Sequence, residues 1–376
     1  MRRLGVVAAV ALALLAPAPA GAGAAVPQPD ARAFYVVNAT TGEVLAARNA
    51  RARLPVASIT KLMTAIVALR HLRLDETVTV SRSAARVGES RIPLRPGQEV
   101  TVRDLLAGAL VQSANDAADA LADAAADGDR ALFVSWMNAE ARRLGLADTH
   151  FVRPDGLDVP GHVSSARDVY VLARAAMRIP IVRRLVRERE DTIEGGRVRL
   201  HTWNDLLGVF PGLVGVKTGH TDEAGWCQVA AVRRPGYTLY AVILGSPTRA
   251  LRNDGLRRLL AWGVSRFRRV ALVRPHAYAH AALGYGRPAV PLVAAGTLVR
   301  VVHADRPLVR KVIAATAAPL PVRRGERLGR VEVWQDGKLL GAEPLVAARS
   351  VARPGLGGRI RWYATRTVHD LWGLLP

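Results

Sequence analysis

The sequence predicts an α+β domain with an antiparallel sheet, followed by a small all-β domain. Two β-prone runs, several helical patterns and three more β-prone runs occur in that order before residue 268. Helices inserted between an N-terminal hairpin and a C-terminal meander are typical of an antiparallel sheet covered by helices. The 376 residues suffice for two cores, because one core rarely grows beyond about 250–300 residues.

The composition indicates a globular protein in anionic surroundings. Hydrophobic residues make up 50% and charged residues 22%, and 53 Lys+Arg against 31 Asp+Glu give a net charge of +22. Such an excess suits lipid head groups or cell-wall polymers. Because no basic run is interleaved with aromatic residues, we expect no nucleic-acid partner. Cys227 is the only cysteine, so no intrachain disulfide forms, and its apolar strand-like context predicts a buried, inert thiol.

The N-terminus has the pattern of an export signal, predicted over residues 1–25. Met1–Arg3 is basic, Val6–Leu15 is apolar, and Ala20–Ala25 offers small residues for cleavage. The apolar run is too short for an ordinary transmembrane helix, although anchoring without cleavage is the alternative. We therefore expect an exported protein at the outer face of the cytoplasmic membrane, in the periplasm or in the cell wall.

The first domain is expected over residues 26–267. It begins with two strands joined by a tight turn, and a helix with an apolar stripe starts near Ser58. A capping-box pattern at Thr101–Asp104 opens a helix that should stop near Gln112. Asn115 resembles the cap of the next helix, so Ser113–Asn115 falls in a tight link. The remaining elements, in order, are helices over Ala131–Leu144 and Ser164–Met177, strands over Gly212–Gly219, Trp226–Val232 and Thr238–Leu244, and a helix over Ala250–Phe267.

The C-terminal region divides into a β-rich domain, residues 268–352, and a linker with an amphipathic tail, residues 353–376. The tail, Arg359–Leu375, places apolar residues on one helical face. Seventeen residues span only ~25 Å as a helix, short of the ~30 Å hydrocarbon core. Such a helix would lie in the membrane interface, attracted by anionic lipid. A helix docked on its own domain is the alternative.

A serine precedes a lysine by three residues at the start of the first predicted helix. Ser58 and Lys61 would then lie on one face, close enough to interact. A lysine can activate a serine only if its pKa is lowered. Only four lysines occur (Lys61, Lys217, Lys311 and Lys338), so the chain uses arginine almost wherever it needs positive charge. A lysine beside a serine is therefore informative.

Two further motifs follow in order: Ser113-x-Asn115 in a helix link and Lys217-Thr218-Gly219 on a strand. Together with Ser58-x-x-Lys61 they form the set found in penicillin-binding proteins and class A β-lactamases. The chain resembles the D-alanyl-D-alanine carboxypeptidases, the low-molecular-mass penicillin-binding proteins of peptidase family S11. The resemblance covers essentially the whole mature chain, on the stretches Pro55–Thr64, Ser113–Asn115, Phe151–Leu157, Ser164–Asp168 and Pro211–Thr221. It implies a serine β-lactamase/transpeptidase-like first domain.

The resemblance also implies catalytic roles. Ser58 would attack the carbonyl between two D-alanines of a peptidoglycan stem peptide, and Lys61 would take its proton. Ser113 would relay a proton to the leaving amine, and Asn115 would hold Lys61 and the substrate amide. The backbone N–H groups of Ser58 and His220 would form the oxyanion hole.

Substrate binding is expected on the predicted strand. Lys217 and Thr218 would bind the terminal carboxylate, and Gly219 would leave room for the substrate backbone. The histidines show no metal-ligand spacing, so we expect no metal and no cofactor. β-Lactams would inhibit covalently and be hydrolysed slowly, because no Glu-x-x-Leu-Asn element lies between Asn115 and Lys217. A β-lactamase, a DD-endopeptidase and a non-catalytic cell-wall-binding protein are the alternatives.

Overall fold

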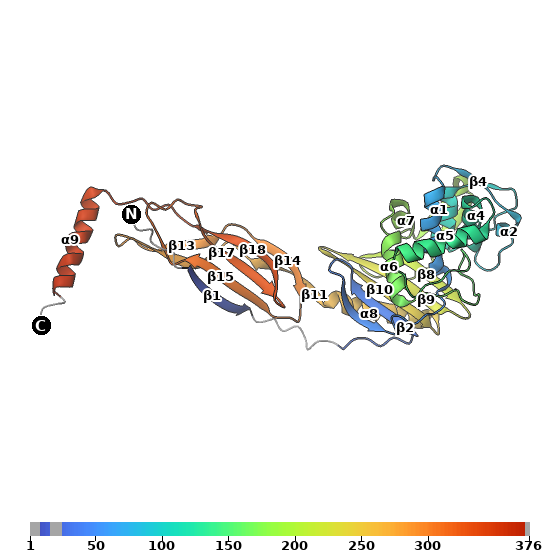
Figure 1. Ribbon diagram of the computed structural model, residues 1–376, viewed down its shortest axis with the longest axis horizontal. Helices are drawn as coiled ribbons and strands as arrows, with labels where there is room; N and C mark the ends of the chain where they lie inside the picture. The colour runs from blue at the N-terminus through green and yellow to red at the C-terminus, as the bar shows by residue number, and fades with distance from the viewer. Residues whose placement is uncertain (1–7, 16–24, 373–376) are drawn as a thin grey trace. The chain divides into compact units, whose positions relative to one another are not determined.

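The computed structural model describes residues 8–15 and 25–372, and it divides into two compact units (Figure 1). One unit extends to Val264. The other begins at Ser265 and includes strand β1 (Ala8–Leu15). Each unit has its own apolar core, as the change in sequence pattern near residue 268 suggests.

A five-stranded antiparallel sheet forms the centre of the first unit, in the order β3-β2-β10-β9-β8. The N-terminal hairpin joins the C-terminal meander where β2 pairs with β10, which closes residues far apart in sequence into one sheet. The predicted α+β class is confirmed. The strands are β2 (Ala33–Asn38), β3 (Glu43–Arg48), β8 (Leu213–Thr221), β9 (Gly225–Arg234) and β10 (Tyr237–Ser246).

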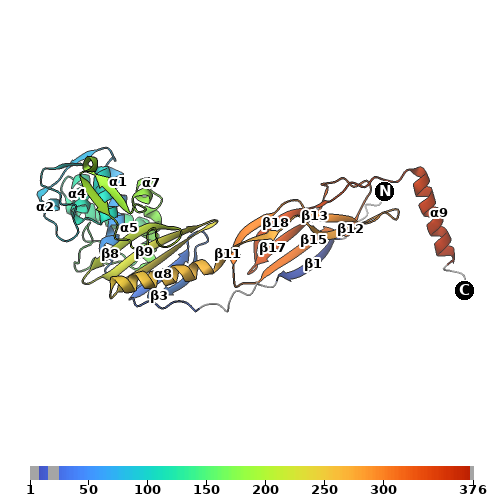
Figure 2. The same cartoon turned by 180° about the vertical axis from the view of Figure 1, so that it is seen from behind.

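Helices cover both faces of this sheet. Helix α8 (Arg249–Ser265) packs on the face that carries Val36, Leu239 and Ile243, where Gly255 and Gly263 permit its close approach (Figure 2). The other helices lie on the opposite side, where α6 contacts β2, β9 and β10 and the rest pack mainly on one another (Figure 1). They are α1 (Lys61–His71), α2 (Arg82–Ala85), α3 (Val102–Ala107), α4 (Asn115–Ala125), α5 (Arg130–Arg143), α6 (Ala166–Ala176) and α7 (Pro180–Leu185).

Two small ribbons in this unit were not expected from the sequence. Strand β4 (Thr77–Thr79) pairs with β5 (Glu99–Thr101), and β6 (Glu190–Ile193) pairs with β7 (Val198–His201). These strands have three or four residues each, too few for a period-two pattern to stand out. The single thiol, Cys227, is fully buried on β9.

The second unit is all-β, as predicted, apart from its C-terminal helix. A seven-stranded sheet runs in the order β1-β15-β17-β18-β13-β12-β16, and β11 pairs with β14 separately. Its strands are β11 (Phe267–Val273), β12 (Ala277–Leu283), β13 (Val290–Ala294), β14 (Leu298–His303), β15 (Leu308–Ala315), β16 (Ala317–Ala318), β17 (Arg327–Gln335) and β18 (Lys338–Ala347).

Both ends of the chain depart in detail from expectation. Most of the predicted export signal lies outside the described residues, but Ala8–Leu15 forms β1 and pairs with β15. Helix α9 (Leu356–Trp372) begins three residues before Arg359, so the prediction that residues 353–358 form a linker was wrong for residues 356–358, which are helical. Within residues 8–15 and 25–372, no helix is both long and apolar enough to cross a membrane.

Candidate active site

Ser58 lies in a turn of 3-10 helix, η1 (Ala57–Thr60), that leads directly into α1. Ala57 adopts a left-handed backbone conformation (φ 50°), which sets the turn apart from the helix that follows. Gly156 packs so closely on this turn that a Cβ there would overlap the carbonyl oxygen of Ala57. The close packing of Gly156 against Ala57 therefore supports the turn and holds Ser58, the candidate nucleophile, in a rigid position.

Lys61 is fully buried and has three hydrogen-bond partners. Its Nζ donates to Ser58 Oγ (2.7 Å), Asn115 Oδ1 (2.6 Å) and the main-chain oxygen of Asp155 (2.6 Å). Burial lowers the Lys61 pKa to about 8, against the opposing influence of the Asp155 carboxylate. The amide and carbonyl oxygens can only accept hydrogen bonds. A neutral amine would therefore donate to those two and direct its lone pair at the Ser58 hydroxyl.

Ser113 and Asn115 lie where two helical segments meet. The π-helical turn η2 (Gly108–Gln112) ends at Ser113, whose φ of 64° is left-handed, and Asn115 begins α4. The Asn115 main-chain N–H donates to the carbonyl oxygen of Ser90 (2.7 Å), and its Nδ2 donates to that of Gly88 (2.9 Å). The predicted tight link is thus present, and it ties Asn115 to a neighbouring loop.

Lys217 projects from β8 toward Ser113. Its Nζ donates to Ser113 Oγ (2.8 Å) and to the Thr218 carbonyl oxygen (3.0 Å). Burial lowers the Lys217 pKa well below its ordinary value, and the nearby charges of Lys61 and Arg252 add to the effect. An entering carboxylate would have the opposite effect and favour the ammonium form.

Gly219 permits β8 to approach the Ser58 turn. A Cβ at this position would lie 2.8 Å from the carbonyl oxygen of Val56 and 3.1 Å from the main-chain nitrogen of Ser58. Gly219 is therefore needed for the packing of β8 against the Ser58 turn. From the sequence alone, this glycine is expected only to leave space for the substrate. The side chain of His220, the next residue, is exposed and stacks on Trp226 with ring centroids 4.1 Å apart.

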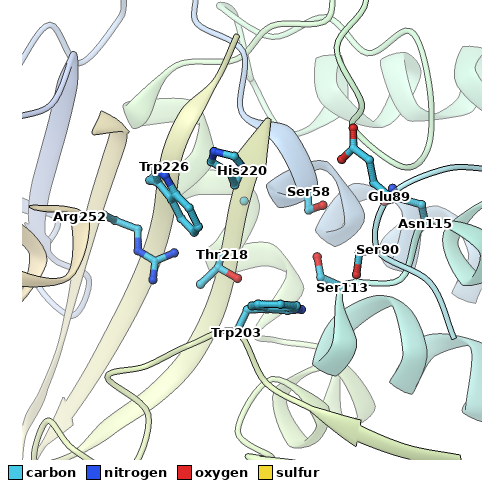
Figure 3. Close-up of a pocket in the computed structure, with 11 residues that line it drawn as sticks. Ser58, Glu89, Ser90, Ser113, Asn115, Trp203, Thr218, His220, Trp226 and Arg252 are labelled. Carbon is cyan, nitrogen blue, oxygen red and sulfur yellow. The ribbon is translucent and has the colours of Figure 1, made fainter. Parts of the chain in front are cut away.

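These residues surround one pocket of about 230 Å³ (Figure 3). Of the eight site residues predicted from sequence, six line the pocket, and Lys61 and Lys217 are buried behind the lining residues. The lining residues are Ser58, Glu89, Ser90, Ser113, Asn115, Trp203, Thr218, Gly219, His220, Trp226 and Arg252.

Arg252 is the main functional candidate that the sequence did not reveal. It comes from α8, is 1% exposed, and pairs with Asp205 at 3.1 Å while stacking over the Trp226 ring at 5.4 Å. Burial lowers its pKa to about 10, so it keeps its charge near neutral pH. In an arginine-rich chain, one more arginine on a helix gives no signal.

A second group of charges lies behind Lys61. Arg153 pairs with Asp155 (2.5 Å), and Arg130 approaches Asp119 (2.7 Å). Burial opposes ionisation of Asp155, but the Arg153 hydrogen bond and the Lys61 charge outweigh it and lower the Asp155 pKa. Burial, reinforced by Asp155, raises the pKa of Asp119 to about 7. These carboxylates favour the charged form of Lys61 and so counter part of the effect of burial.

No set of three or more His, Cys, Asp or Glu side chains among the described residues is arranged to hold a metal ion. The pocket brings together the Ser58 hydroxyl beside a lysine of lowered pKa, the Ser113 hydroxyl, the Asn115 amide, and two basic side chains, Lys217 and Arg252. This arrangement suits nucleophilic attack on a carbonyl next to a carboxylate.

Comparison with known proteins agrees with this chemistry. A family model described as D-alanyl-D-alanine carboxypeptidase, Peptidase_S11, matches residues 20–248. The D-alanyl-D-alanine carboxypeptidase DacC of Escherichia coli is 33% identical, over 92% of this chain and 90% of the relative. DacF of Bacillus subtilis is 30% identical, over 87% of each chain.

Solved structures give the same result. Penicillin-binding protein 5 from Haemophilus influenzae, 27% identical, superposes with a TM-score of 0.63 over 88% of this chain and all of its own. Penicillin-binding protein D2 from Listeria monocytogenes in its ampicillin-bound form is 34% identical, with a TM-score of 0.57 over 63% of this chain and 98% of its own.

Proposed function

The chain belongs to the D-alanyl-D-alanine carboxypeptidase family S11, and on that basis we propose how its pocket removes the terminal D-alanine from a peptidoglycan stem peptide. It is a serine-type hydrolase of the penicillin-binding class. The observation that carries the mechanism is the contact between Lys61 Nζ and Ser58 Oγ at 2.7 Å, inside a pocket that also holds Ser113 and Asn115.

In the acylation step, neutral Lys61 accepts the proton of Ser58 Oγ as the oxygen attacks the carbonyl carbon of the scissile D-Ala-D-Ala bond. The backbone N–H groups of Ser58 and His220 stabilise the oxyanion, each donor being worth ~3 kcal/mol in comparable sites. When the intermediate collapses, the C–N bond breaks and the leaving amine receives a proton that Lys61 gives up through the Ser113 hydroxyl. Water later hydrolyses the acyl-enzyme.

The cationic side of the pocket receives the substrate carboxylate. Thr218 supplies a hydroxyl donor and Arg252 a permanent charge, while Lys217 takes up a proton when the carboxylate arrives. Arg252 extends the carboxylate site beyond the residues expected from sequence. The requirement for a free terminal carboxylate follows from this charge.

β-Lactams inhibit the enzyme covalently, because they present a reactive carbonyl beside a carboxylate to the same serine. The Listeria relative described in ampicillin-bound and cefotaxime-bound forms supports this. Slow release of the adduct distinguishes such a protein from a β-lactamase.

Export and attachment to the membrane surface complete the proposal. The basic and apolar N-terminal pattern supports export. In α9, Leu356, Ile360 and Tyr363 are 76%, 63% and 56% exposed, beside Arg359 and Arg361. Exposed apolar residues next to arginines are what an interfacial helix needs to bind an anionic lipid surface.

The function is tested with a fluorescent penicillin and a pentapeptide ending in D-Ala-D-Ala. We expect the wild type to retain the label and the pentapeptide to lose one D-alanine by mass spectrometry, and Ser58→Ala to do neither. Rapid penicillin turnover without a persistent adduct would favour a β-lactamase. Cleavage of cross-linked dimers but not of the pentapeptide would favour an endopeptidase.

A further inference from the structure

Glu89 lines the pocket, yet the mechanism above gives it no role. Its side chain is exposed, and no hydrogen bond or ion pair to another described residue holds its carboxylate. Figure 3 shows it beside Asn115, at the opposite end of the pocket from Arg252. The charge in the pocket is therefore asymmetric, with the Arg252 guanidinium at one end and the Glu89 carboxylate at the other.

Asn115 fixes the backbone on both sides of Glu89. Asn115 donates hydrogen bonds to the carbonyl oxygens of Gly88 (2.9 Å) and Ser90 (2.7 Å), one on each side of Glu89. Ser90 Oγ in turn donates to the Gln112 carbonyl oxygen (3.1 Å). Glu89 itself has a φ of 62°, a conformation that costs a residue with a Cβ some free energy and is often retained at functional sites.

The carboxylates near Glu89 disfavour its charged form, which a cation bound beside it would stabilise. Partial burial raises the Glu89 pKa, the carboxylates of Asp158, Asp155 and Asp222 raise it further, and the charge of Lys61 opposes them. An ammonium group arriving beside Glu89 would offset this repulsion.

The direction of the substrate follows from the proposed function. Once the terminal carboxylate lies at Lys217 and Arg252 and the scissile carbonyl lies at Ser58, continuing in the same direction brings the rest of the peptide toward Glu89. The side chain that precedes the D-alanines is then the first part of the substrate to pass this carboxylate.

We propose that Glu89 is a specificity-determining residue that binds a free ammonium group on the side chain preceding D-Ala-D-Ala. The preferred substrates are uncross-linked peptides that carry a side-chain amine at that position. Acylation of the amine, as happens in a cross-link, removes the charge and the contact. This inference rests on the proposed function, since the carboxylate end sets the direction.

The test compares two tripeptides that differ in one charge: Nα-acetyl-L-Lys-D-Ala-D-Ala and its Nα,Nε-diacetyl analogue. We expect kcat/KM for D-alanine release by the wild type to be about two- to fivefold higher for the free amine, the range of one exposed ion pair. In Glu89→Gln the two values should become equal, and in Glu89→Lys the order should reverse. The wild-type preference should also shrink as salt rises.

The ratio of the two substrates is the readout because Glu89 also raises the Lys61 pKa, an effect common to both peptides. Glu99→Gln is the matched control, an exposed glutamate on β5 that does not line the pocket, and it should keep the wild-type ratio. Equal kcat/KM values in the wild type, or a preference that survives in Glu89→Gln, would overturn the inference. An equal loss of kcat for both peptides in Glu89→Gln would also overturn it, because that result would assign Glu89 a role as a base in deacylation. If the wild type released no D-alanine from either peptide, the proposed function itself would fail.

Discussion

Replacing Gly219 by alanine should damage catalysis more than stability. The new Cβ would lie 2.8 Å from the Val56 carbonyl oxygen and 3.1 Å from both Ala57 Cβ and the Ser58 main-chain nitrogen. Since non-bonded carbon contacts are normally ~3.5–4.0 Å, strand β8 and the Ser58 turn must separate by roughly half an ångström. Displacements of this order cost about 10- to 100-fold in rate when they misalign a nucleophile and its oxyanion donors.

The assay is the second-order rate of labelling by a fluorescent penicillin, measured together with the melting temperature. Overpacking of about 1–3 kcal/mol should lower the melting temperature by only about 2–12 °C. Gly263→Ala is the control, because its Cβ would overlap Leu239 Cδ2 (2.7 Å) in the same unit but away from Ser58. A Gly219→Ala protein that labels at the wild-type rate would refute the reasoning, and so would equal rate losses in both variants.

Three further results are expected. The labelling rate should be half-maximal near pH 8, reach a plateau above about pH 9 and fall to roughly a tenth of the plateau at pH 7, because the proposed base, Lys61, must be neutral and has a pKa of about 8. A rate independent of pH between 6 and 9 would exclude Lys61 as that base. Asp119→Asn removes a carboxylate that raises the Lys61 pKa, so the acidic limb of the same profile should move to lower pH by less than about one unit, whereas exposed Asp127→Asn should leave it in place. Deleting Arg359–Pro376 should release the protein from vesicles containing anionic lipid without altering labelling, and continued sedimentation with the vesicles would contradict the interfacial role proposed for α9.

The sequence was informative where local patterns carry structure. The hairpin, the meander and the link at Ser113–Asn115 each have turn or capping signals, and the structure contains them. The spacing of Ser58 and Lys61 translates directly into a 2.7 Å contact, because three residues make nearly one helical turn. The catalytic roles of these residues remain predictions.

Other features depend on tertiary contacts that no local pattern encodes. Arg252 reaches the pocket from a helix that lies across the sheet, and the Asp155 main-chain oxygen reaches Lys61 through the folding back of a loop. Glu89 occupies the pocket because Asn115 holds the residues on both sides of it. Predicting each of these contacts requires the distance between segments far apart in sequence, which the residue type alone does not give.

The single buried thiol gives this molecule a built-in reporter of its own unfolding. Cys227 has no exposed surface, so an alkylating reagent cannot reach its sulfur in the folded sheet. Burial also raises its pKa to about 11, which keeps the thiol out of the reactive thiolate form. Its alkylation rate therefore follows the transient opening of β9, the strand next to β8. A slower alkylation in the presence of a covalently bound β-lactam would show directly that acylation of Ser58 stiffens the central sheet.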